Sequence, residues 1–238
     1  MNIWMLLLAG TIVLGGAVVQ GSVGFGMNLV AAPLLAIADP VLVPVPLLVT
    51  ASAFAVLPLV RERGQADWRG VRWALVGRLP GTVLGVAALA LLPSRWLAVL
   101  IGVVVLVSVG LSLLTWHPRP VPSTLFTAGV FSGVFGTAAA VGGPPMALVY
   151  QHNTGPTVRS TLSAYFALGS LLSLGALLLS GQVQPQQLLA AAVLFPFAML
   201  GFVLSGPLRR PLDRGGTRPA LLGLAAFSAL SLLFKALG

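Results

Sequence analysis

Long apolar stretches, separated by short segments that hold most of the charged residues, make up almost the whole chain. The stretches span residues 3–38, 41–60, 71–92, 95–116, 122–150, 157–180, 186–207 and 218–237. A helix needs about 20 apolar residues to cross a bilayer, and six of these eight stretches have that length. The pattern therefore predicts an all-α polytopic membrane protein that forms a single membrane domain over residues 1–238.

Two of the stretches are too long for one straight span. As continuous helices, residues 3–38 and 122–150 would measure roughly 54 Å and 43 Å, whereas the hydrocarbon core is about 30 Å thick. Both carry a glycine-rich interruption, "QGSVGFG" at 20–26 and "GVFGTAAAVGGPP" at 133–145. Each stretch is therefore either a broken helix that crosses once or a helical hairpin, re-entrant or spanning, that returns to its own side.

Positive charge favours the hairpins. With two hairpins, ten Lys and Arg residues fall on one face and two on the other, whereas two single crossings divide the same residues evenly. The ten are Arg61, Arg63, Arg69, Arg72, Arg119, Arg159, Arg209, Arg210, Arg214 and Arg218, and the two are Arg95 and Lys235. Because Lys and Arg concentrate in cytoplasmic loops, we expect both termini on the periplasmic or extracellular side of a bacterial inner membrane.

The two halves of the chain resemble each other. Gly21, Gly24 and Pro33 recur at one common offset as Gly133, Gly136 and Pro145. A hairpin followed by three spans reverses the chain an odd number of times, so a tandem copy is inserted upside down. We therefore expect two inverted-topology repeats, residues 1–117 and 118–238, which is a frequent plan in secondary transporters.

The two helix breaks are candidate parts of a substrate site. Irregular backbone at membrane depth is tolerated only inside protein or beside a water-filled cavity. A helix that restarts after such a break points its positive N-terminal end at the break, where it attracts anions. The candidate substrate-binding residues are Gln20, Ser22, Gly24, Phe25, Gly26, Asn28, Thr50, Ser52, Gly136, Thr137, Gly142, Gly143, Pro144, Arg159, Thr161, Ser163 and Tyr165.

Structural roles compete with these assignments. Hydroxyl groups often bond helix carbonyls in membranes, and the GxxxG pairs Gly81…Gly85 and Gly129…Gly133 favour close helix packing. Arg78, inside the third stretch, either extends its charge to the cytoplasmic interface or draws anions into a vestibule. Arg159 either binds an anionic group or marks the cytoplasmic end of its span. His152 is a candidate for proton coupling or a structural interfacial residue.

Composition excludes several classes of function. The chain is 58% hydrophobic with a mean hydropathy of +1.03, and only 7% of its residues are charged, against about 25% in a soluble domain. The net charge of +9 comes from loop arginines, so nucleic acid is not an expected partner. There are no cysteines and two histidines, so we expect no catalytic residues, no metal site and no cofactor. The expected partners are a small anion, the lipid bilayer and a coupling proton or sodium ion, and a homodimer stays open.

Beside this interpretation, the chain resembles the TauE/SafE family, also called the four-toluene sulfonate uptake permease family. The segments that carry the resemblance are "GSVGFGMNLVAAPLLAIADP", "GVFGTAAAVGGPPMALVYQ", "VRSTLSAYFALGSLLSL", "LPGTVLGVAAL" and the "DW" at 67–68. The resemblance implies transport of small sulfur-containing anions such as sulfite, sulfoacetate or other sulfonates, driven by an ion gradient as export or import, of which we expect export. The residues themselves indicate an anion transporter without indicating sulfur. A passive anion channel and a carboxylate transporter are the alternatives.

Overall fold

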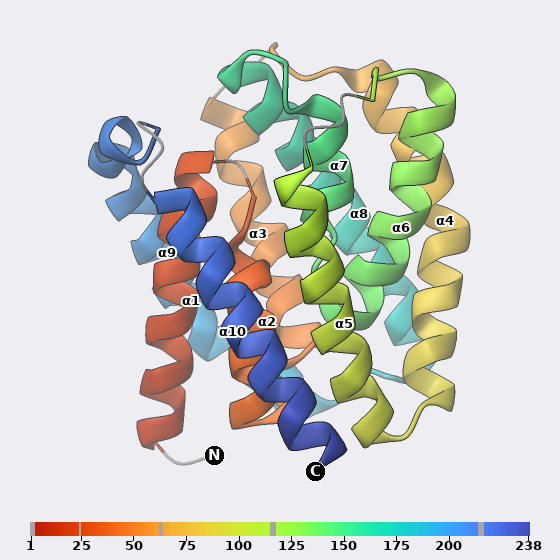
Figure 1. Cartoon of the computed structure of the whole chain (residues 1–238), viewed down its shortest axis with the longest axis vertical. Helices are drawn as coiled ribbons and strands as arrows, with labels where there is room; N and C mark the ends of the chain where they lie inside the picture. The colour runs from red at the N-terminus through yellow and green to blue at the C-terminus, as the bar shows by residue number, and fades with distance from the viewer. Residues whose placement is uncertain (1–2, 24, 62–63, 115–117, 214–216) are drawn as a thin grey trace.

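The computed structural model describes residues 3–23, 25–61, 64–114, 118–213 and 217–238, with side chains placed at 4–21, 25–57, 64–114, 118–206 and 221–238. Helices account for nearly all of the described chain, which contains no strand (Figure 1). They are α1 (Ile3–Val23), α2 (Met27–Ala38), the short 3-10 helix η1 (Pro40–Leu42), α3 (Val45–Arg61), α4 (Trp68–Leu91), α5 (Ser94–Leu113), α6 (Pro122–Ala139), α7 (Gly143–Tyr150), α8 (Gly155–Leu179), α9 (Pro185–Asp213) and α10 (Thr217–Leu237).

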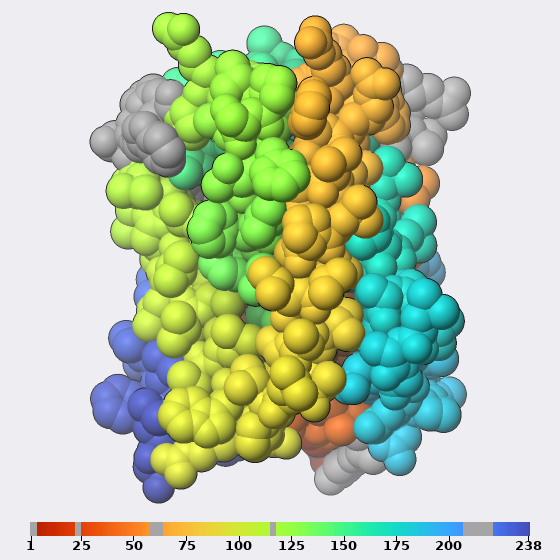
Figure 2. All heavy atoms as spheres, turned by 90° about the vertical axis from the view of Figure 1, so that its right-hand side faces the viewer, coloured from red at the N-terminus to blue at the C-terminus, as the bar shows by residue number. Residues whose placement is uncertain are grey.

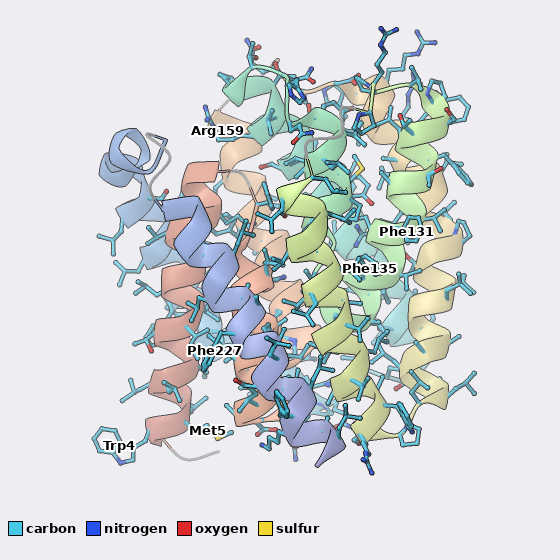
Figure 3. All side chains as sticks on the ribbon, in the orientation of Figure 1. Trp4, Met5, Phe131, Phe135, Arg159 and Phe227 are labelled. Atoms are coloured by element: carbon cyan, nitrogen blue, oxygen red, sulfur yellow. The ribbon has the colours of Figure 1, made fainter. Side chains whose placement is uncertain are left out.

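Among the described residues, six helical segments are long and apolar enough to cross a membrane. They are Trp4–Gly21, Pro40–Leu57, Trp68–Leu91, Ser94–Leu113, Gly155–Leu179 and Pro185–Gly206. Large apolar side chains point outward from them, and Figure 3 shows Trp4 directed away from the bundle at its lower end. A soluble protein rarely exposes so much contiguous apolar surface, whereas lipid tails accommodate it. The chain is therefore a multi-pass helical membrane protein, as the sequence pattern predicts.

The first glycine-rich interruption separates α1 from α2. Gly26 has a φ of 118°, a backbone conformation that favours glycine, and the chain turns back there. Met27 then packs against Gly16, since a Cβ on Gly16 would lie 2.9 Å from the Met27 carbonyl oxygen. Figure 1 shows α2 running back toward the end of the bundle at which α1 begins.

The second interruption separates α6 from α7 in the same manner. Ala140 closes α6 with a φ of 59°, which is uncommon for a residue with a side chain, and Gly143 starts α7. A Cβ on Gly142 would lie 2.9 Å from the carbonyl oxygen of Ser132, so the returning chain lies against α6. In Figure 1, α7 runs back toward the end at which α6 begins.

Glycines bring the helices α4 and α6 into backbone contact. A Cβ on Gly81 would collide with the carbonyl oxygen of Val130, and one on Gly133 would lie 2.7 Å from that of Arg78. Figure 2 shows α4 and α6 side by side over the upper part of one face. The packing role predicted for the GxxxG pairs is thus confirmed, because no larger residue fits this contact.

Apart from Arg78, charged residues with described side chains lie toward the two ends of the bundle. At the lower end in Figure 1, near both termini, Arg95 donates to the carbonyl oxygen of Leu237 and Lys235 donates to that of Ile37, each at 2.9 Å. The helices α4, α6 and α8 begin at the opposite end, where Arg159 is labelled in Figure 3. Six of the ten arginines expected on that face have side chains outside the described residues, so the ten-to-two distribution stays a prediction.

Candidate functional site

Both helix breaks contribute to one small buried cavity. It has a volume of about 40 Å³. Its lining comprises Gln20, Phe25, Gly26, Asn28, Leu29, Leu48, Ala51, Arg78, Gly136, Ala140, Val141, Gly142, Gly143, Pro144, Phe166 and Ser170. A water molecule needs roughly 10–15 Å³ of such volume, so the cavity has room for only a few water-sized groups.

The two breaks touch each other directly. The side-chain amide of Asn28, in the first turn of α2, donates to the carbonyl oxygen of Ala140 at 2.8 Å. The Phe25 ring lies beside Gly143, where a Cβ would be 3.3 Å from the ring. On the first side, Gln20 Oε1 accepts the backbone N–H of Met27 at 3.3 Å and so caps the start of α2. Residues more than 100 positions apart thereby form a single site.

Arg78 enters this cavity from α4. Its side chain is 2% exposed, and its guanidinium donates through Nη1 to Ser132 Oγ at 3.3 Å and through Nη2 to Ser173 Oγ at 3.2 Å. The guanidinium carbon also lies 5.2 Å from the centre of the Tyr165 ring, within cation–π range. Arg78 therefore does not extend to the membrane interface, which was one of the two interpretations of the sequence.

Two glycines make room for this guanidinium. A Cβ on Gly169 of α8 would lie 2.7 Å from both Cζ and Nε of Arg78, and one on Gly136 of α6 would lie 2.8 Å from Nη2. The serine partners are themselves held, because Ser132 donates to the carbonyl oxygen of Gly142 and Ser173 shares a hydrogen bond with Thr137 at 2.8 Å. The guanidinium is thus packed between α4, α6 and α8 beside the second break.

The charge of Arg78 has no acidic partner among the described side chains. Asp39 accepts the N–H of Val41 in η1, and Asp67 accepts the N–H of Gly70 and the hydroxyl of Tyr150. Burying an unpaired charge costs several kcal/mol, which neutral serine hydroxyls offset only in part. Three buried polar atoms have no hydrogen-bond partner in or beside this region: Arg78 Nε, Asn28 Oδ1 and the Tyr165 hydroxyl.

The structure brings together about half of the residues that the sequence singles out. The predicted residues that line the cavity are Gln20, Phe25, Gly26, Asn28, Gly136, Gly142, Gly143 and Pro144, together with Arg78. Tyr165 contacts the guanidinium of Arg78, and Thr137 is connected to it through a hydrogen bond to Ser173.

Other candidates lie away from the cavity. Thr50 and Ser52 donate to carbonyl oxygens of their own helix, and Thr161 accepts the backbone N–H of Asp67 at 3.0 Å. Ser163 is buried without lining the cavity, Arg159 lies beside Gly155 at the start of α8, and His152 is exposed in the connection after α7. Gly24 and the side chain of Ser22 lie outside the described residues.

One face of α8 was missed by the sequence interpretation. Phe166 and Ser170 line the cavity, while Gly169 and Ser173 contact Arg78. These four residues are spaced i, i+3, i+4 and i+7, which places them on one side of a helix. That spacing of small and hydroxyl residues in an apolar span is the signal that could have revealed the face.

A small cavity formed where two helices break between membrane-spanning helices is an arrangement typical of secondary transporters. The family model described as "Sulfite exporter TauE/SafE" matches residues 8–232. The chain therefore belongs to the TauE/SafE family of transporters, which confirms both the resemblance and the prediction that it is not an enzyme.

One curated relative is 28% identical over 237 residues, covering 93% of this chain and 91% of its own length. It is the probable sulfite/organosulfonate exporter TauE of Cupriavidus necator. No solved structure matched the chain.

Proposed function

We propose that the protein is a secondary active transporter that exports small sulfur-containing anions, such as sulfite or sulfonates, across the bacterial inner membrane. The observation that carries this proposal is the single small cavity to which both helix breaks contribute. The name of the relative in Cupriavidus necator supports sulfur as the substrate element and export as the direction. The anion binds at the midplane between the two breaks, and an ion gradient drives transport.

The proposed mechanism is alternating access between two inverted repeats, residues 1–117 and 118–238. Helix contacts support the repeats, because the most extensive helix pairings have counterparts when α1–α5 are matched to α6–α10. The pair α4–α6 corresponds to α9–α1, and the pair α3–α9 corresponds to α8–α4, while α3–α8 and α5–α10 correspond to themselves. A pseudo-two-fold relation of this kind lets one half rock against the other around a shared site.

Uptake of labelled sulfite into proteoliposomes tests the function. With a pH or sodium gradient we expect accumulation above the equilibrium level, stimulation by unlabelled sulfite on the far side, and competition by sulfonates but not by carboxylates. Gradient-independent flux without stimulation from the far side would identify a passive channel. Competition by carboxylates alone would show that the substrate is a carboxylate and not a sulfur-containing anion. An absence of any flux would refute the proposal.

A further inference from the structure

Arg78 is the only charged residue that lines the described cavity. A guanidinium carries five N–H donors and stays protonated inside proteins. The hydrogen bonds to Ser132 and Ser173 use two of these donors, and Nε has no partner although it is buried. Both partners are neutral hydroxyls, so the site keeps one net positive charge, and the guanidinium keeps a donor that no described group accepts.

The two helix starts supply few donors of their own. The first N–H of α2, from Met27, already donates to Gln20. Pro144 and Pro145 have no N–H, so Gly143 alone can donate among the first three residues of α7. An anion between the breaks would therefore depend on a side chain for most of its hydrogen bonds.

The cavity also presents one unused acceptor. Asn28 is 8% exposed and lines the cavity, and its Nδ2 donates to Ala140, which leaves Oδ1 buried without a partner. A carbonyl-type oxygen repels a fully deprotonated dianion, whereas it accepts a hydrogen bond from a protonated oxygen of the ligand. One positive charge with one free acceptor matches a monoanion better than a dianion.

We propose that the Arg78 guanidinium anchors the transported anion and that the cavity selects a small singly charged oxyanion, of which hydrogensulfite is an example. This inference rests on the proposed function and assigns the ligand of the same site. A volume of about 40 Å³ suits an anion of four or five heavy atoms. In this proposal Arg78 contacts the bound anion directly and is not part of a cytoplasmic vestibule.

Binding of sulfite to the purified full-length protein at neutral pH, followed by calorimetry, tests the role of Arg78. We expect Arg78→Gln to weaken binding at least tenfold and Arg78→Lys to weaken it less. Arg72→Gln is the matched control, since Arg72 lies on the same helix but is exposed, and its affinity should equal that of the wild type. Wild-type affinity in Arg78→Gln would overturn the inference.

Gly169→Ala provides a second test that keeps the charge. The added methyl group would displace the guanidinium, so we expect weaker sulfite binding in a protein that still contains Arg78. Gly175→Ala on the same helix meets no atom within 4 Å and should bind like the wild type. If Arg78→Gln does not fold, this pair decides the question, and equal affinity in both variants would overturn the inference.

Charge selectivity is tested with two probes of similar size. Methanesulfonate and sulfate each have five heavy atoms in a tetrahedron, but they carry one and two negative charges respectively. We expect methanesulfonate to compete with sulfite at neutral pH at least tenfold better than sulfate does. Equal or stronger competition by sulfate would overturn the monoanion assignment.

Transport assays distinguish failure of this inference from failure of the proposed function. If the wild type transports sulfite and Arg78→Gln transports it equally well, the inference fails and the proposed function stands. If the wild type neither binds nor transports sulfite, both fail.

Discussion

At the scale of single residues, threonines with the same chemistry have different partners. The hydroxyl of Thr50 donates to the carbonyl oxygen of Pro46, four residues earlier in α3. That of Thr161, in α8, accepts the N–H of Asp67 at the start of α4. Thr50 therefore satisfies a group within its own helix, whereas Thr161 connects two helices that are far apart in sequence.

This difference predicts that a threonine-to-valine substitution lowers stability at position 161 but not at position 50. Thr161→Val leaves the Asp67 N–H without its protein partner, so we expect a loss of about 1 kcal/mol of stability. Thr50→Val removes a hydroxyl from a carbonyl that already accepts a helical hydrogen bond, so we expect little change. Thermal unfolding of the two purified variants measures this, and sulfite affinity should stay at the wild-type value in both because neither residue lines the cavity. A larger loss in Thr50→Val would contradict the assignment.

At the scale of elements, glycines set how closely helices approach. Gly77, Gly81 and Gly85 of α4 face α6, and a Cβ on any of them would meet a backbone or Cβ atom of α6 too closely. Arg78 lies between Gly77 and Gly81 on α4, and Gly136 lies on α6, so the same contact positions the wall of the cavity. Close packing of α4 and α6 is therefore a condition for the site as well as for the fold.

Alanine substitutions separate packing glycines from incidental ones. Gly81→Ala forces α4 away from the Val130 carbonyl oxygen, and such overpacking typically costs about 1–3 kcal/mol. Gly110→Ala on α5 meets nothing within 4 Å and should leave stability unchanged or raise it by about 0.5 kcal/mol. Chemical denaturation in detergent compares the pair. Equal stability of the two variants would show that the α4–α6 contact adapts to a methyl group.

At the scale of the whole molecule, both termini lie at one end of the bundle, and α4, α6 and α8 begin at the other (Figure 1). The sequence contains no cysteine, so a single introduced cysteine can be labelled without background. Gln65 is exposed in the connection before α4, and Gln186 is exposed at the start of α9 near the opposite end. These two positions report on the two faces of the membrane.

We expect a membrane-impermeant maleimide to label Gln186→Cys in intact cells and Gln65→Cys only after the inner membrane is opened. Gln65 lies at the arginine-rich end of the helical bundle, and the positive-inside rule places that end in the cytoplasm. The cysteine-free wild type is the control for background. The reverse labelling pattern would invert the proposed orientation, and labelling of both positions from one side would contradict two exposed ends.

The sequence alone determined the membrane class, the positions of the spans, the two helix breaks and the packing glycines. These features depend on local composition and on helical spacing, which can be measured along the chain without knowledge of neighbours. The contributions of Phe25, Asn28 and Gly143 to one cavity were also predictable, since the breaks had to be buried away from lipid.

Only the tertiary structure decided which polar residues meet. Arg78 donates to Ser132 and Ser173, which are 54 and 95 positions away, and Thr161 accepts from a residue 94 positions away. An arginine inside a span can extend toward the interface or turn inward, and its own sequence context is similar in both cases. The choice follows from the space that Gly136 and Gly169 leave on neighbouring helices, which is a property of helix packing and not of the segment itself.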